Sequence, residues 1–596
     1  MININDINTR IDKLNSELLE NAKKYNRISY LRLISIALTI YFSVKFIGSG
    51  ITFSEGLIII TTLIVFGVFV WLHIRLKKTE KRILSLKKVY ERYIDRINGK
   101  WNKFEDIGEE FIDDNHSFSS DLDIFSKGSL FQLINCTHTF LGRKKLSDTL
   151  LLKGSRVDIN QKQEAIEEIS NKFDFITRFE SLASLNCSSK NDSKNLTEFL
   201  LTGSKNKIGK VLRGIVFVLP IALWVSIFLS YITLNKMLLN STYVLVIINI
   251  VLTGYMFLKG YAGFSAVTPF KRELKSYTEL FKMIEEEEFT SKKLTTLKEE
   301  LTKGEKASSV LHKLEKITSN IDMRYNPLAF LFLNIFFLWD YQCMFALEDF
   351  KAKYGPKIQS YIEVIGNIEE YISLSTIKNT NQTTCIPCIV DNKVIVQGED
   401  VGHPLIGGEN RVSNSVNMDN NILVITGSNM SGKTTYLRTI GINLILAYTG
   451  ANVVASKFNC SYLNVVTSMR ISDNLDMGIS TFYAELLKIK KIIDASKEDK
   501  PMIFLIDEIF RGTNSQDRIV GAISVINNLS KDNIIGGIST HDFELCDINN
   551  GRVANYHFEE HYDNGKILFD YKIKSGISTT KNAKFLMRMV GIDIQE

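Results

Sequence analysis

The sequence predicts a multidomain protein in which an α-helical region with two pairs of apolar helices precedes a C-terminal α/β domain. Four long apolar runs before residue 260 predict the helix pairs. After about residue 384, short β-type runs alternate with helical patterns, which is typical of an α/β domain with a largely parallel sheet. The five predicted strands are Asn421–Thr426, Met502–Ile506, Ile534–Ser539, Val553–Phe558 and Lys566–Ile573. With 596 residues and 45% hydrophobic content, the chain is long enough for several domains with substantial cores.

The apolar runs come in two pairs, Leu31–Ile47 with Leu57–Ile74 and Gly214–Ile232 with Thr242–Leu258. Each run approaches the roughly 20 residues that a helix needs to cross a bilayer, so we expect two transmembrane hairpins, with buried core helices as the alternative. Lysines and arginines flank the outer ends of both pairs. The positive-inside rule then places the N-terminus, the helical core and the α/β domain in the cytoplasm of a multi-pass protein of the bacterial inner membrane.

The remaining segments complete the expected organisation. Leu328–Trp339 is apolar but short and meets Asp340, so we expect a buried core helix rather than a fifth span. Thr376–Thr384, rich in Thr and Asn, is expected to be a linker. The predicted units are an amphipathic helix (1–30), the first transmembrane hairpin (31–76), an amphipathic helical connector (77–119), the first part of a helical core (120–207), the second hairpin (208–260), a helical lever that forms the second part of the core (261–375) and the α/β domain (376–596).

The two amphipathic segments are expected to continue the first hairpin beyond the membrane as solvated helices. In the first, Ile7, Ile11 and Leu14 lie on one stripe at helical spacing, and in the second Val89 and Tyr93 do so. A lipid-contacting role for the basic residues of the second segment is the weaker alternative.

Charge and cysteine content narrow the function classes. The net charge of +6 is small for this length, so no chain-wide basic field for nucleic acid is visible, although a local basic face remains possible. The acidic run Glu285–Glu288 would repel DNA phosphate. Seven scattered cysteines do not form a disulfide framework and indicate a reducing compartment. Cys385 and Cys388 have half-zinc-site spacing without a second pair, so we expect no zinc, and we expect no haem.

The strongest motif follows the predicted strand Asn421–Thr426 and fits the pattern G-x-x-x-x-G-K-[ST]. Its glycines allow backbone N–H groups to surround phosphates at a helix N-terminus. Lys433 is expected to contact the β- and γ-phosphates, and Thr434 to ligate Mg²⁺. The expected nucleotide-binding residues are Gly427, Ser428, Asn429, Met430, Ser431, Gly432, Lys433, Thr434 and Thr435.

Two further elements supply the catalytic groups expected beside Lys433. The apolar strand Met502–Ile506 ends in Asp507 and Glu508. Asp507 is placed to hold Mg²⁺, and Glu508 to act as the general base that polarises water. His541 follows the predicted strand Ile534–Ser539, where it would sense the γ-phosphate as a neutral imidazole; a structural histidine is the alternative. We therefore expect an enzyme that hydrolyses ATP with Mg²⁺.

These residues together resemble the MutS family of DNA mismatch-repair ATPases. The phosphate loop Thr426–Thr434 resembles that family's loop, including Asn429 and Met430. Asp507–Asn514 is similar to its acidic strand end with an R-G-T turn, and Ser472–Leu486 to its signature segment. Further similar stretches are Gly402–Leu405, Thr540–Leu545, Thr137–Leu151, Asn160–Ile169 and Asn334–Tyr371.

The resemblance implies a P-loop ATPase domain of the ABC/MutS type that works as a homodimer with composite sites. It implies that Ser480 approaches the γ-phosphate in trans, with Thr481 in the same signature segment and Asn514 near the dimer interface. Nucleotide state would then move the helical levers. The alternative is that Ser480 only caps a helix.

The chain also departs from the family's pattern. Membrane segments stand where a mismatch-reading domain would precede the core, so any DNA contact is expected from the helical core, through phosphates. The alternative is a membrane ATPase that couples hydrolysis to transport or to a membrane-protein partner without DNA.

Overall fold

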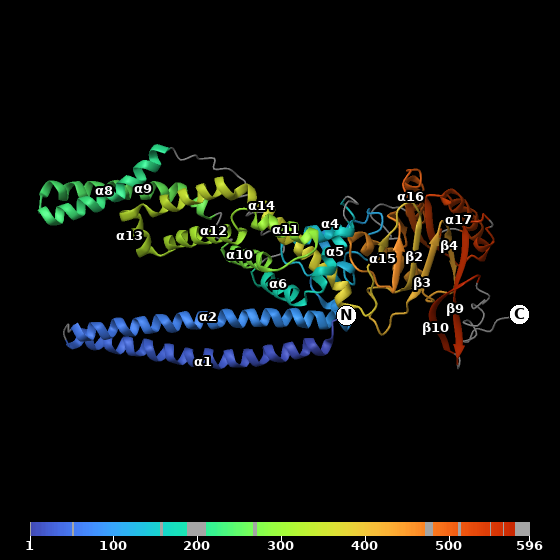
Figure 1. Cartoon of the computed structure of the whole chain (residues 1–596), viewed down its shortest axis with the longest axis horizontal. Helices are drawn as coiled ribbons and strands as arrows, with labels where there is room; N and C mark the ends of the chain where they lie inside the picture. The colour runs from blue at the N-terminus through green and yellow to red at the C-terminus, as the bar shows by residue number, and fades with distance from the viewer. Residues whose placement is uncertain are drawn as a thin grey trace.

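A computed structural model describes residues 2–49, 53–154, 159–186, 210–265, 271–470, 481–510, 514–548, 550–563 and 566–577. The molecule is elongated, with the α/β domain at one end and the far ends of two helical hairpins at the other (Figure 1). A helical region lies between them. The expected order, a helical region followed by an α/β domain, is confirmed.

The first hairpin consists of α1 (Ile4–Ser49) and α2 (Phe53–Ile97). Each amphipathic segment continues an apolar run within one helix, as expected, and Ile7 and Tyr93 are fully buried near the base of the hairpin. Our prediction of a helical connector as far as residue 119 is wrong beyond Ile97, because Gly99 adopts the left-handed conformation that ends a helix. Only two single turns follow, η1 (Trp101–Lys103) and η2 (Glu109–Phe111).

The helical core is built around α14 (Trp339–Thr380), a 42-residue helix roughly 63 Å long at 1.5 Å per residue. It reaches from the second hairpin to the α/β domain (Figure 1). The predicted linker at Thr376–Thr384 is wrong as far as Thr380, because Thr376 and Ile377 are buried and keep the chain helical. The other core helices are α3 (Leu130–Ile134), α4 (Phe140–Leu150), α5 (Ile159–Ser170), α6 (Phe173–Asn186), α10 (Lys271–Glu286), α11 (Lys292–Thr302) and α12 (Ala307–Asp322).

The second hairpin consists of α8 (Lys210–Thr233) and α9 (Lys236–Ser265). Within the described residues, these two helices, α1 and α2 are each long and apolar enough to cross a membrane. The apolar segment Leu328–Trp339 forms most of α13 (Pro327–Phe337), which follows the single turn η4 (Met323–Tyr325). Our expectation of a buried core helix there is wrong: α13 packs only one side against α8 and α9, and Leu328 is 81% exposed.

The α/β domain contains a six-stranded sheet of order β10-β9-β4-β8-β7-β6, parallel except for the edge strand β10. All five predicted strands are present in it: β4 (Ile422–Thr426), β7 (Met502–Asp507), β8 (Ile534–Ser539), β9 (Val553–Asp563) and β10 (Lys566–Ser575). Sequence reasoning missed β6 (Asn464–Ser468). It also missed a second, mixed sheet of β1 (Cys388–Ile389), β2 (Ile395–Val401), β3 (Asn414–Asp419) and β5 (Lys457–Cys460).

One continuous apolar core joins the helical region to the α/β domain. It runs from Ile365 and Ile372 of α14 to Ile440 and Leu444 of α15 (Lys433–Thr449), the helix that follows β4. A second core lies under the other part of the sheet, against α16 (Thr481–Ala495) and α17 (Ser515–Leu529). Helix α15 contacts α4 and α5, and both of these helices contact α14.

Candidate functional site

The loop between β4 and α15 closes tightly because of its backbone. Strand β4 is buried at every position, so the loop begins at the carboxyl end of the sheet. Gly427 has φ 148° and Gly432 φ 111°, and a Cβ at Gly427 would lie 3.0 Å from the carbonyl oxygen of Phe558. Met430, also at positive φ, is 86% exposed. The two glycines therefore allow the chain to turn into α15 with its first amides directed at the pocket.

Lys433, the first residue of α15, lies under this loop. Its Nζ donates hydrogen bonds to the carbonyl oxygens of Gly427 (2.8 Å) and Ser428 (2.9 Å), and the side chain is almost fully buried. Ser431 is buried as well, and its Oγ has no hydrogen-bond partner among the described residues. A buried ammonium and an unsatisfied hydroxyl in one loop fit a ligand that carries anionic oxygens.

Asp507 and Thr434 meet in front of the sheet. Asp507 ends β7, and its Oδ2 accepts a hydrogen bond of 2.8 Å from Thr434 Oγ1. Its Oδ1 accepts one from Ser539 Oγ, at the end of the neighbouring strand β8. The carboxyl ends of parallel strands thus assemble a carboxylate and a hydroxyl, the oxygen ligands that Mg²⁺ prefers.

Glu508 and His541 face each other across the same edge. Glu508 has φ 48°, and its backbone N–H donates to the Ser539 carbonyl oxygen at 3.1 Å. His541 Nε2 lies 3.2 Å from Glu508 Oε1, 2.9 Å from Asn429 Oδ1 and 3.4 Å from Lys433 Nζ. A hydrogen on Nε2 would be donated to the oxygens of Asn429 and Glu508. The structure therefore brings together all three residues that we expected to be catalytic.

Three supporting residues were missed by sequence reasoning. Arg518 of α17 makes a bidentate ion pair with Asp542, next to His541, with bonds of 2.7 and 2.6 Å. Glu560 of β9, almost fully buried, accepts a hydrogen bond from Ser428 of the loop. Arg518 and Glu560 lie outside every motif, and each reaches its partner only through the order of strands in the sheet, so no sequence signal identified them. Asp542 lies within a motif, but sequence reasoning gave it no role.

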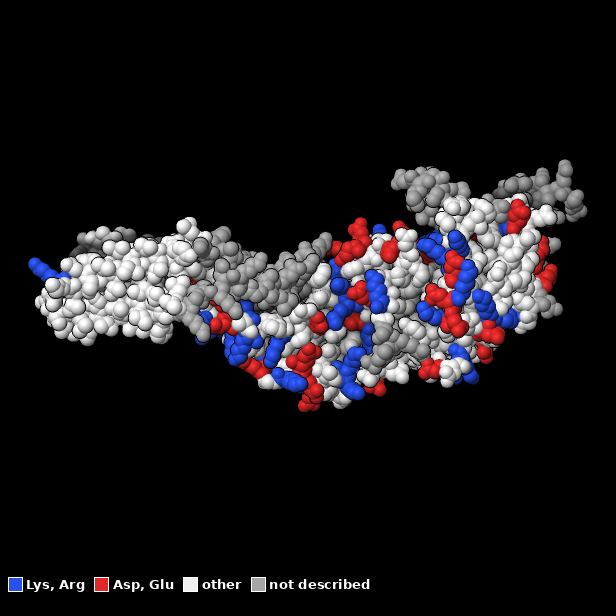
Figure 2. Space-filling model, turned by 90° about the horizontal axis from the view of Figure 1, so that it is seen from above, with Lys and Arg blue, Asp and Glu red and all other residues white. Residues whose placement is uncertain are grey.

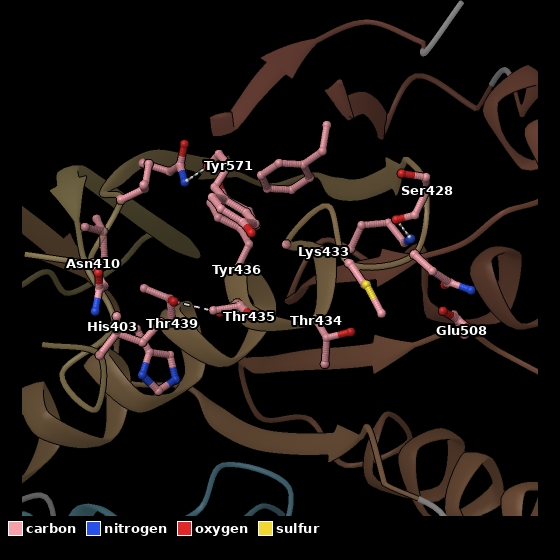
Figure 3. Close-up of a pocket in the computed structure, with 18 residues that line it drawn as sticks. His403, Asn410, Ser428, Lys433, Thr434, Thr435, Tyr436, Thr439, Glu508 and Tyr571 are labelled. Atoms are coloured by element: carbon pink, nitrogen blue, oxygen red, sulfur yellow. Dashed lines mark hydrogen bonds between the residues drawn. The ribbon is translucent and has the colours of Figure 1, made fainter. Parts of the chain in front are cut away.

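A pocket of about 250 Å³ extends from the loop toward the second sheet (Figure 3). Ser428, Lys433, Thr434 and Glu508 lie at one end, and His403 and Asn410 at the other. Burial, together with the nearby Arg438 and Arg411, lowers the pKa of His403 to about 3, so its imidazole is neutral at physiological pH. The pocket thus has a polar end and an apolar side wall, which is contributed by Val401, Ile406, Val412, Tyr436, Phe558 and Tyr571.

Of the residues expected in trans, the structure describes Thr481 and Asn514. Thr481 begins α16, and Ser480 lies outside the described residues. Asn514 caps α17: its Oδ1 accepts from the Asp517 N–H at 2.8 Å, and the side chain is exposed. Glu485 of α16 accepts a hydrogen bond from the backbone N–H of Phe510, which ties the signature helix to the segment after Glu508.

Comparison with known proteins identifies the C-terminal part of the chain. Residues 423–591 match the family model "MutS domain V". A DNA mismatch repair protein MutS of a Geobacillus strain is 30% identical over 248 residues, 40% of this chain and 28% of that protein. The MutS of Clostridioides difficile is 31% identical over 39% of this chain and 25% of its own length. The DNA mismatch repair protein MSH3 of Vanderwaltozyma polyspora is 30% identical over 39% and 24%. The chain spans about a quarter of the length of these relatives.

Proposed function

Because this chain belongs to the MutS family through its C-terminal part, we propose that it is a membrane-anchored ATPase that binds and hydrolyses Mg²⁺–ATP. The observation that carries the proposal is the convergence of Lys433, Asp507 and Glu508 at one end of a pocket. A buried cation, a carboxylate–hydroxyl pair and a second carboxylate are the groups that phosphoryl transfer to water requires.

Each residue has a chemical role in this proposal. Lys433 leaves the carbonyl oxygens of Gly427 and Ser428 and donates instead to the β- and γ-phosphates. Thr434 and Asp507 hold Mg²⁺, which neutralises phosphate charge when bound. Glu508 accepts a proton from the attacking water, and His541 Nε2 donates a hydrogen bond to the γ-phosphate. Ser431 Oγ, buried in the loop, gains an acceptor.

We propose that two copies complete each other's sites. The pocket is lined by Met430 and Asn429, both on the exposed side of the loop. In a homodimer, Ser480 and Thr481 of one copy would cover this side in the other, with Asn514 at the interface. Such closure excludes water other than the nucleophile, which strengthens the charge interactions inside.

The proposed anchor is the pair of apolar hairpins, which makes the chain a multi-pass membrane protein with the ATPase domain in the cytoplasm. Large apolar side chains cover the outside of α8 and α9; Phe217 is 65% exposed and Val251 is 66% exposed. The face of this end that Figure 2 shows carries almost no charged side chain. Side chains of this kind belong in hydrocarbon rather than in water.

For the partner that the levers act on, we propose DNA held through its phosphates by the helical core, since the named relatives are DNA mismatch repair proteins. A membrane partner without DNA is the second candidate. The observation that favours it is that the helical region ends in two apolar hairpins, whereas phosphate contacts need Lys and Arg.

The test is the ATPase rate of the full chain in nanodiscs, with duplex, mismatched or branched DNA, across a salt series. Glu508→Gln removes the proposed base, and Glu498→Gln, an exposed residue paired with Lys500, is the matched control. We expect the wild type and the control to hydrolyse ATP. In Glu508→Gln the ATPase rate should fall by about 100-fold or more, which is the usual size of a general-base effect.

The outcomes separate the partners. Stimulation by DNA that fades with salt supports the DNA partner. Turnover that every DNA leaves unchanged rejects it and favours a membrane partner. No turnover in the wild type, or equal turnover in wild type and Glu508→Gln, refutes the proposed hydrolysis.

A further inference from the structure

Helix α13 exposes a row of large apolar side chains next to the second hairpin. Leu328, Leu331 and Phe332 are 81%, 54% and 51% exposed, and the helix contains no charged residue. Its other side packs on the hairpin: the ring of Phe336 lies 5.6 Å from that of Trp224, and Phe330 lies 5.9 Å from Phe257. The apolar surface of α13 is therefore continuous with that of α8 and α9.

The junction of α13 and α14 is a sharp bend whose freed backbone groups are paired internally. The two helices meet at 81° at Leu338, which has φ 50°. Asn334 Oδ1 accepts from the Asp340 N–H at 2.9 Å, so it caps the first turn of α14. Asn249 Nδ2 of α9 donates to the Ile335 carbonyl oxygen at 2.7 Å.

Two further side chains beside this junction donate hydrogen bonds to backbone carbonyl oxygens of neighbouring helices. Trp339 Nε1 donates to the Asn320 carbonyl oxygen at 3.0 Å, which satisfies the end of α12. Tyr341 Oη donates to the Leu252 carbonyl oxygen of α9 at 3.1 Å. At a surface in contact with water, solvent would satisfy such groups, whereas in hydrocarbon each needs a protein partner.

A buried ion pair lies at the same place. Arg324 and Asp340 approach to 3.4 Å with side chains 7% and 3% exposed, and the guanidinium lies 5.0 Å from the ring centre of Phe257 and 5.4 Å from that of Phe264. Charges at membrane depth are tolerated where they are paired and covered by protein. By contrast, the Arg213–Asp349 pair, farther along α14 toward the core, is exposed.

We propose that α13 is a re-entrant membrane segment that enters the bilayer hydrocarbon beside the second hairpin and returns without crossing. At 11 residues, it is roughly 16 Å long and too short to span. The helices before and after it, α12 and α14, pack against each other and lead back to the core (Figure 1). This proposal rests on the membrane anchoring proposed above. It makes α14 one uninterrupted helix from the bilayer to the ATPase domain.

Spin labels on the full chain in nanodiscs test this placement. Starting from a chain with Cys187, Cys385 and Cys388 replaced by Ser, single labels are placed at Leu331→Cys, at Phe228→Cys on the exposed side of α8, and at His312→Cys on the polar side of α12. Collision rates are measured with oxygen, which concentrates in hydrocarbon, and with a water-soluble nickel chelate. All three positions are exposed, so the labels do not disturb packing.

We expect the oxygen-to-nickel ratio at 331 to match that at 228 and to exceed that at 312 several-fold. A ratio at 331 equal to that at 312, with 228 in hydrocarbon, overturns the proposal and leaves the anchoring intact. Low collision with both reagents at 331 means that protein covers α13 and also overturns it. If 228 and 331 are both in water, the anchoring itself fails.

Discussion

The ion pair between Arg518 and Asp542 is predicted to hold His541 in position, so Arg518→Met should slow ATP hydrolysis without touching the pocket. The two bonds are 2.7 and 2.6 Å, and the side chains are 29% and 12% exposed. Asp542 raises the pKa of Arg518 by accepting these bonds. Charge-assisted bonds contribute about 1.5–3 kcal/mol each when buried, and partial exposure reduces the pair to about 1–2 kcal/mol.

The ion pair affects the rate by keeping the imidazole of His541 in place. If the stabilisation of about 1–2 kcal/mol is lost in the transition state, kcat falls about 5- to 30-fold, at 1.36 kcal/mol per tenfold. The assay is steady-state ATPase in nanodiscs with saturating Mg²⁺–ATP. Lys497→Met is the matched control, because it breaks an exposed pair with Asp494 on the far side of the domain.

The background variant His541→Ala separates positioning from general destabilisation. If Arg518 acts through His541, adding Arg518→Met to His541→Ala should change kcat less than about twofold, since interacting residues are not additive. An equal loss in both backgrounds, or wild-type kcat in Arg518→Met, would refute the reasoning. The Asp542→Asn variant, which keeps the shape of the turn, should lose less than Arg518→Met.

Two other predictions concern the metal and the helical core. Asp507→Asn keeps an acceptor for Thr434 but loses a charge, so the Mg²⁺ concentration for half-maximal ATPase should rise by about tenfold or more, whereas an unchanged value would argue against this ligand. Glu369 is buried in α14, and desolvation raises its pKa above the usual 4.5 despite hydrogen bonds from Thr139 and His138. The folded state therefore loses stability as pH rises from about 4.5 through the raised pKa. In thermal unfolding, the Tm of Glu369→Gln should rise relative to the Tm of the wild type over that pH range. A difference in Tm that stays constant from pH 4 to 7 would contradict this.

Much of the site could be predicted because it depends on local sequence. The glycines of the loop, the strand that ends at Asp507 and the residue after it are all set by short-range patterns. Parallel strands place their carboxyl ends at one edge, so Lys433, Glu508 and His541 were expected together. Arg518 and Glu560 were not predictable, because α17 and β9 reach the loop only through the order of strands in the sheet.

The helical region shows where local patterns mislead. Thr and Asn at Thr376–Thr384 are typical of a linker, but packing of Thr376 and Ile377 against the core extends α14 through them. Leu328–Trp339 has the composition of a core helix, and composition cannot distinguish a helix buried in protein from one that exposes an apolar face. Which of the two holds depends on the helices around the segment. Here α8 and α9 pack against one side of α13 only.

By itself, the sequence determined the local parts of this protein: the glycine-rich loop, the two carboxylates, the histidine and the four apolar helices are properties of contiguous residues. Only the tertiary structure decided how these parts are connected. It joined Asp542 to Arg518 and placed Arg324 against Asp340. It also made α14 a single helix between the second hairpin and the α/β domain. The physical reason is that hydrogen bonds and apolar contacts between distant segments depend on which surfaces meet, and short-range periodicity does not encode that.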